Sequence, residues 1–117
     1  PYLLGRLFAV LEKAQLDALG RVNSTIKDRF FSAASATPGS VFPRLLRLSQ
    51  HHIDKAELGH LSDRRISEIM ENIQDFPAHM NMQEQGIFAI GYYHQKNELW
   101  RKKNTETNQG EGENNNE

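Results

Sequence analysis

Apolar residues recur at helical spacing from the start of the chain to about position 103, and this pattern restricts the fold more than any other feature. Apolar residues three and four positions apart fall on one side of a helix. No stretch shows the sustained alternation typical of a strand, and no Asn-Gly or Asp-Gly hairpin turn occurs. The sequence predicts an all-α protein, a single compact bundle of about five helices.

The first two helices are predicted from their apolar faces and end signals. The first is expected to stop at Gly20, with polar residues Arg6, Glu12, Lys13 and Asp17 opposite an apolar face of Leu3, Leu4, Leu7, Phe8, Val10, Leu11 and Ala14. Asn23 or Ser24 can cap a short second helix. Its apolar side is formed by Ile26, Phe30 and Ala33.

A loop is predicted from Ser32 to Ser40, because Thr37-Pro38-Gly39 is a turn-like composition and a residue before proline disfavours helix. Ser40 is expected to cap a third helix that runs to about Ala56, with Pro43 tolerated in its first turn. A fourth helix is expected from Ser62 to Phe76-Pro77; its core positions are Ile66, Ile69, Met70 and Ile73.

The last helix is predicted over residues 82–103, opened by a capping box between Asn81 and Glu84. It is apolar nearly all round, so it is either central to the bundle or partly covered by a partner protein. Gly86 and Gly91 indicate close backbone packing. The candidate protein-interface residues are Phe88, Tyr92, Tyr93 and Trp100.

Residues 104–117 differ from the rest of the chain. They contain four acidic residues, no basic residue and no apolar residue, so they have nothing to bury and are expected to be disordered. The predicted organisation is a helical bundle domain over 1–103 and a disordered acidic, Asn-rich tail over 104–117. Without the tail, 14 basic and 11 acidic residues remain, a net charge of +3, which permits nucleic-acid binding.

Composition and motif spacing argue against an enzyme. The chain has no cysteine, its five histidines lack the i, i+4 spacing of a helical metal site, and no serine elbow or phosphate-binding loop occurs. No metal, cofactor, small-molecule substrate or membrane partner is expected. The chain is expected to be soluble and cytoplasmic, with an N-terminus at Pro1 that is processed or trimmed.

Basic residues are the more informative candidates for function. On the third predicted helix Arg44, Arg47, His51 and Lys55 share one arc opposite the apolar side. A row of cations suits contact with phosphates, without reading of bases. A second group comprises Arg21, Lys27 and Arg29. The alternatives are a solubilising surface and a contact with an acidic protein.

Two sequence blocks carry a resemblance to a known family. The first covers residues 23–38 and 41–52, from Asn-Ser-Thr-Ile-Lys-Asp-Arg-Phe-Phe to Leu-Ser-Gln-His-His, and the second covers 76–79 and 84–95. Together with the opening residues they resemble the C-terminal region of the large subunit of the type I-C CRISPR Cascade. A chain restricted to this region is similar to the Cascade small subunit, which is made by internal translation.

The resemblance implies a non-catalytic helical bundle in a prokaryotic, cytoplasmic, crRNA-guided complex that serves antiviral defence. Its partners would be the large subunit, the backbone subunits, further copies of itself and the R-loop of crRNA and target DNA, chiefly the displaced strand. Guide pairing reads the sequence in such complexes, so the protein is expected to contact DNA backbone only. The alternative function is a structural spacer that contacts only protein.

Overall fold

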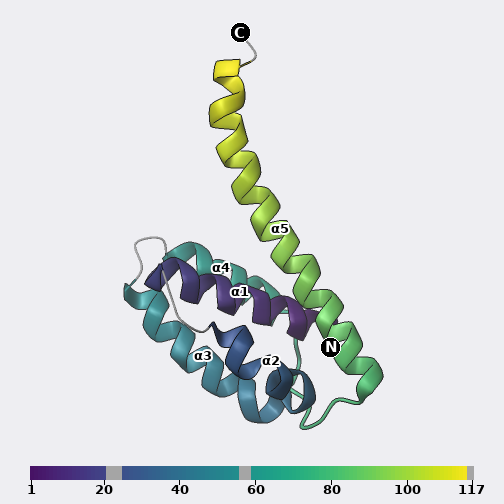
Figure 1. Ribbon diagram of the computed structural model, residues 1–117. Coiled ribbons are helices and arrows are strands. Elements are labelled where there is room, and N and C mark those ends of the chain that lie inside the picture. The colour runs from purple at the N-terminus through teal and green to yellow at the C-terminus, as the bar shows by residue number, and fades with distance from the viewer. Residues whose placement is uncertain (21–24, 56–58, 116–117) are drawn as a thin grey trace.

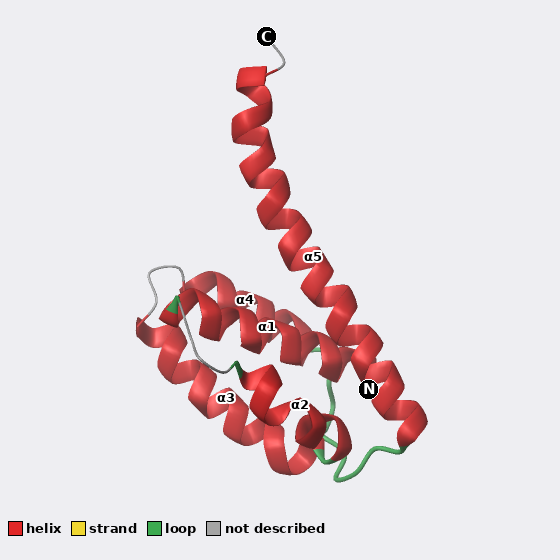
Figure 2. Cartoon of the chain, viewed as in Figure 1, coloured by secondary structure: helices red, strands yellow, loops and turns green. Residues whose placement is uncertain are grey.

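The computed structural model describes residues 1–20, 25–55 and 59–115, and it describes side chains in these ranges except at 52, 54–55, 59–60 and 102–115. Within them the chain forms helices and no strand, as the sequence predicts (Figures 1 and 2). The helices are α1 (Tyr2–Leu19), α2 (Ile26–Ala36), α3 (Pro38–Lys55), α4 (Gly59–Met70) and α5 (Met82–Asn115).

Helix α1 is the central element of the bundle, since it contacts each of the other four helices. The ring of Phe8, fully buried on α1, has four aromatic neighbours at centroid distances of 5.6 to 6.4 Å, all edge-on: Phe31, Phe42, Phe88 and Tyr92. Edge-on pairs are the favoured geometry for aromatic rings and add to the stabilisation from burial. One aromatic cluster therefore joins α1, α2, α3 and α5.

Helices α1 and α5 approach until their backbones touch. A Cβ atom on Gly5 would collide with the carbonyl oxygen of Phe88, and one on Gly91 would collide with the carbonyl oxygen of Tyr2. The close packing predicted at Gly91 is confirmed. The same prediction is wrong for Gly86, which has open space where a Cβ would be.

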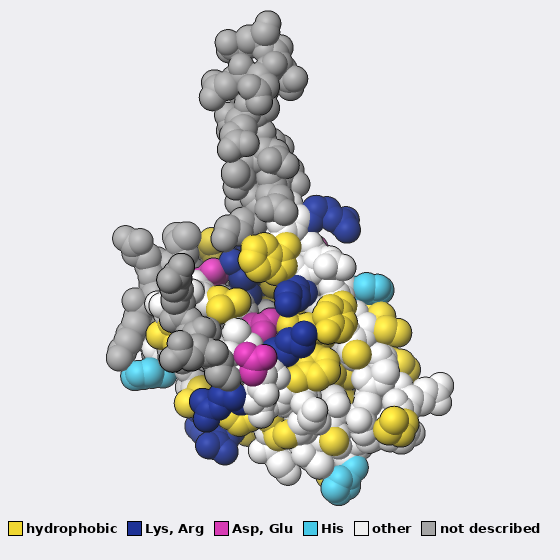
Figure 3. Space-filling view, in the orientation of Figure 1, with side chains coloured by type: hydrophobic (Ala, Val, Ile, Leu, Met, Phe, Trp, Pro, Cys, Tyr) yellow, Lys and Arg dark blue, Asp and Glu magenta, His cyan; other side chains and the backbone are white. Residues whose placement is uncertain are grey.

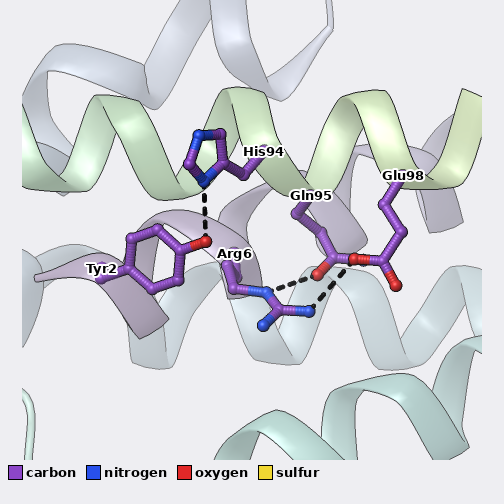
Figure 4. Close-up of polar contacts among 5 residues, drawn as sticks. All are labelled: Tyr2, Arg6, His94, Gln95 and Glu98. Atoms are coloured by element: carbon purple, nitrogen blue, oxygen red, sulfur yellow. Dashed lines mark hydrogen bonds and ion pairs between the residues drawn. The ribbon is translucent and has the colours of Figure 1, made fainter.

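Polar contacts along the α1–α5 contact align the two helices (Figure 4). The hydroxyl of Tyr2 and Nδ1 of His94 are 2.8 Å apart. Arg6 donates from Nε to Gln95 Oε1 at 2.7 Å and reaches Glu98 at 3.4 Å. These bonds join residues from opposite ends of the sequence, so the chain ends of the bundle are tied together.

The capping signals are confirmed at Gly20 and at the capping box of Asn81 and Glu84. Gly20 ends α1 with a positive φ of 72°, and Asn81 and Glu84 exchange bonds of 3.0 and 2.8 Å at the start of α5. Helix α2 begins at a different residue from the predicted caps, because Thr25 forms a capping box with Asp28. Asn23 and Ser24 lie outside the described residues.

The loop predicted from Ser32 to Ser40 is wrong. Only Thr37 separates α2 from α3, and its backbone N–H donates to Ala33 to close α2. Proline is favoured in the first turn of a helix, where its missing N–H costs nothing, so Pro38 begins α3 and does not interrupt it. Helix α3 therefore starts before Ser40, and Pro43 lies inside it.

Helix α4 is displaced toward the N-terminus relative to its prediction. It begins at Gly59 and ends at Met70, after which Asn72 and Ile73 form tight turns on Ile69 and Met70. The predicted core positions nevertheless pack against the core, including Ile73, which lies beyond the helix. Burial of these apolar side chains does not require that the backbone stay helical.

Helix α5 continues past residue 103, and Figure 1 shows its C-terminal part projecting away from the other helices. The helical backbone reaches Asn115 across the acidic segment. The disorder of 104–117 in solution stays a prediction from composition.

Candidate nucleic-acid interface

Helix α3 separates an apolar side from a cationic side. Phe42, Leu45 and Ser49 are buried, and Ile53 continues this side toward the end of the helix. Arg44 and Arg47 are exposed on the other side. The spacing of three places their side chains next to each other, one turn apart. The periodicity of the sequence thus gives α3 one face for the core and one for solvent.

Helix α2 adds a third arginine to this surface. The Arg29 guanidinium lies 5.3 Å from the centroid of the Phe30 ring, and the Arg44 guanidinium lies 5.7 Å from the same centroid. Cations at such distances from an aromatic ring are attracted to its π-system. Phe30 therefore connects Arg29 of α2 with Arg44 of α3. We call Arg29, Arg44 and Arg47 the cationic face.

The cationic face lacks acidic partners among the residues that the structure describes. The ion pairs among the described residues lie elsewhere: Arg6 pairs with Glu98, and Lys13 pairs with Asp17, on α1 and α5. Figure 3 shows one group of Lys and Arg side chains at the lower left of the view and a second group nearer the centre that is mixed with Asp and Glu. Guanidinium groups without a carboxylate partner are available to an external anion, with two N–H donors each.

The structure describes the other predicted interface residues only in part. His51 is exposed on α3 in line with the two arginines, and its side chain has a contact of its own. Lys55 ends α3, but its side chain lies outside the described part. Arg21 is also outside it.

Lys27 belongs to another part of the molecule. Its Nζ donates to the Tyr93 hydroxyl at 3.1 Å and lies 5.1 Å from the Tyr93 ring and 5.4 Å from the Tyr92 ring. These contacts hold the lysine against α5. Lys27 and Arg29 therefore do not belong to one surface as predicted, because residues two apart on a helix point to different sides.

Of the four aromatic residues predicted for a protein interface on α5, two are buried and two are exposed. Phe88 and Tyr92 are fully buried in the bundle core, so they have no surface left for a partner. Tyr93 and Trp100 are each 46% exposed. The interface predicted for this helix is narrowed to these two residues. Two further exposed apolar side chains, Met82 and Ile90, also lie on α5.

Glu12 is buried, although its position in the sequence does not indicate this. The helical pattern predicts it on the polar side of the first helix, but it is 5% exposed and its carboxylate accepts a hydrogen bond from the Tyr92 hydroxyl. Burial raises the pKa of Tyr92 far above its usual value, and the neighbouring Glu12 adds to the effect. The pair joins α1 to α5 inside the bundle.

Metal-binding and membrane-spanning features are not found in the described part of the chain. Among the described residues no group of three or more His, Asp or Glu side chains converges as a metal site would. No described helix combines the length and hydropathy of a membrane span.

Comparison with known proteins identifies the family. No curated protein matches the chain. The family model described as CRISPR-associated protein (Cas_Csd1) matches residues 1–100, which include all of α1 to α4 and the part of α5 that packs on the bundle. The chain therefore belongs to the CRISPR-associated Csd1 family, the large-subunit family of the type I-C Cascade.

Proposed function

We propose that this chain acts as a non-catalytic small subunit of a type I-C Cascade and holds DNA by its backbone. The observation that supports the proposal is the cationic face, in which Arg29, Arg44 and Arg47 lie exposed on two adjoining helices without a described acidic partner. The family places the chain among CRISPR-associated proteins. An arginine surface in such a complex suits the phosphates of the opened target, chiefly those of the displaced strand.

The proposed binding is independent of base sequence. Arginine contacts to phosphate oxygens fix position but carry no sequence information. Guide pairing supplies specificity in complexes of this kind. The chain would therefore stabilise the R-loop of crRNA and target DNA, alongside the large subunit, the backbone subunits and further copies of itself.

Charge reversal on the cationic face tests this proposal. In the variant Arg44→Glu/Arg47→Glu we expect the affinity of the full chain for single-stranded DNA to fall, as measured by fluorescence anisotropy. The slope of log affinity against log salt should become shallower by about 0.7 for each phosphate that the variant no longer neutralises. The matched control is Arg64→Glu/Arg101→Glu, which reverses the same charge at exposed residues of α4 and α5.

Equal decreases in affinity for the two variants would mean that net charge alone governs binding, and the cationic face would have no special role. Unchanged affinity in both variants would reject the cationic face as the DNA-binding surface of this chain. Both variants change exposed side chains, so their melting temperatures should stay close to that of the parent chain.

A second candidate function is a spacer that contacts only protein. The observation that favours it is the exposed apolar surface of α5, formed by Met82, Ile90, Tyr93 and Trp100. Large exposed apolar side chains on one helix are typical of a protein interface. In the variant Ile90→Glu this function predicts loss of Cascade assembly. If Arg44→Glu/Arg47→Glu also blocks assembly and leaves DNA affinity unchanged, the spacer is favoured over DNA binding.

A further inference from the structure

A cavity opens beside the cationic face, between α1, α2 and α3. Its volume is about 120 Å³, far above the roughly 15 Å³ that a single buried water needs. Phe30 forms an aromatic wall, Leu45 lies on the α3 side, and the exposed Leu48 is at its edge. Arg29 of the cationic face also lines it. The cavity is thus apolar and joined to a cation.

The cavity contains a buried hydroxyl. Ser49 lines the cavity and is 5% exposed, and its Oγ has no hydrogen-bond partner among the residues that the structure describes. A buried polar atom without a hydrogen bond is costly, so the Ser49 hydroxyl is suited to bond a group that enters the cavity. Ser49 occupies a core position on α3, four residues after the buried Leu45 and four before Ile53.

A second polar group in the lining comes from α1. The Gln15 side chain lines the cavity, and its Oε1 accepts the backbone N–H of Ile26 at 3.0 Å. This bond fixes the orientation of the amide and leaves its Nε2 as a donor. The lining of the cavity therefore combines one hydroxyl and one amide with apolar and aromatic side chains.

From this combination we infer that the cavity takes one unpaired nucleobase of single-stranded DNA while the cationic face holds the neighbouring phosphates. The inference rests on the proposed function and names the part of the strand that enters the protein. A base needs a flat apolar or aromatic wall and a few hydrogen-bonding groups, and the cavity provides both. Duplex bases are stacked and paired, so only an opened strand can supply one. Binding stays tolerant of sequence because every base has a π-face.

The test compares two ligands that carry the same phosphates. The full chain is titrated with a short labelled oligothymidylate and with an abasic oligomer of equal length. We expect the oligothymidylate to bind about tenfold more tightly, which corresponds to about 1.4 kcal/mol. Equal affinities would overturn the inference, because the cavity would then hold water only.

Two variants at Ser49 locate the effect. Ser49→Leu fills the cavity and should remove the difference between the two oligomers while leaving the salt dependence unchanged. Ser49→Ala keeps the space and should retain part of the difference. If Ser49→Leu is folded by circular dichroism and still prefers the base-bearing oligomer, the base binds elsewhere and the inference is wrong.

The outcomes also separate this inference from the proposed function. If Arg44→Glu/Arg47→Glu weakens binding of both oligomers but the parent chain does not distinguish them, the cationic face binds DNA and the cavity takes no base. If the charge variant leaves both affinities unchanged, the proposed function fails, whatever the oligomers show.

Discussion

Among individual residues, Tyr92 and Glu12 form the contact that was hardest to predict from the sequence. Tyr92 is fully buried and donates its hydroxyl proton to a carboxylate that is itself 5% exposed. A buried carboxylate is costly unless hydrogen-bonded. An acidic residue beside lysines on an amphipathic helix is normally solvent-exposed, so only the position of Tyr92 across the α1–α5 contact shows that Glu12 faces inward.

Replacing Tyr92 with phenylalanine should destabilise the protein at neutral pH. The variant Tyr92→Phe leaves the Glu12 carboxylate buried without its donor, and the expected decrease is about 1–3 kcal/mol in the free energy of unfolding. Urea denaturation at pH 7 measures it. A decrease below about 0.5 kcal/mol would show that the hydrogen bond contributes little.

The same pair should make stability fall in alkaline solution. The pKa of Tyr92 is raised above its ordinary value of 10.0, so above about pH 10 the unfolded chain releases this proton and the folded chain keeps it. The unfolded state is then favoured, and the contribution falls by up to about 1.4 kcal/mol per pH unit. The stability advantage of the parent chain over Tyr92→Phe should shrink as pH rises above 10. An advantage that stays constant would contradict the raised pKa.

At the scale of elements, the contact between α1 and α5 is set by two glycines that admit the opposing backbone. A Cβ on Gly5 or Gly91 would collide with backbone carbonyl oxygens, which cannot move independently of their helices. Gly86 lies on the same helix α5 with open space around it. Sequence alone assigned Gly86 and Gly91 the same role, because helix propensity does not depend on which side of the helix a glycine occupies.

One substitution at two positions should therefore have opposite effects. Gly91→Ala should destabilise the protein by about 3 kcal/mol or more, at the upper end of overpacking costs. Gly86→Ala should stabilise it by about 0.5–1 kcal/mol, because alanine is the better helix former. Thermal denaturation of both variants tests the pair. Similar destabilisation by both would mean that Gly86 also has a packing role.

The junction between α2 and α3 shows why element boundaries were predicted less well than the elements. Thr37-Pro38-Gly39 is typical of a loop, yet the same residues serve as the end of one helix and the beginning of the next. The composition of a turn and that of a helix start overlap at proline. The short junction has a consequence for the site, since it packs α2 against α3 and brings Arg29 next to Arg44 through Phe30.

For the molecule as a whole, the sequence predicted the all-helical class and the arginine side of α3, because both follow from periodicity along one chain segment. It did not predict that Arg29 joins Arg44 or that Lys27 turns away, since both depend on how α2 lies between α3 and α5. The cavity at Ser49 was also missed. A signal exists in the sequence, namely a serine in line with Leu45 and Ile53, but its meaning depends on three helices meeting there.

The acidic C-terminal segment should be dispensable for the stability of the bundle. Deletion of residues 104–117 removes no apolar residue. We therefore expect a melting temperature within error of the full chain, measured by circular dichroism. A clear decrease would show that this segment packs on the bundle.

A map of the assembled type I-C Cascade containing this chain, with guide and target DNA bound, would show whether the cationic face holds DNA. We expect phosphate oxygens of the displaced strand at hydrogen-bonding distance from the cationic face, about 2.7–2.9 Å from the guanidinium nitrogens of Arg29, Arg44 or Arg47. A map in which these three side chains contact only protein would contradict it.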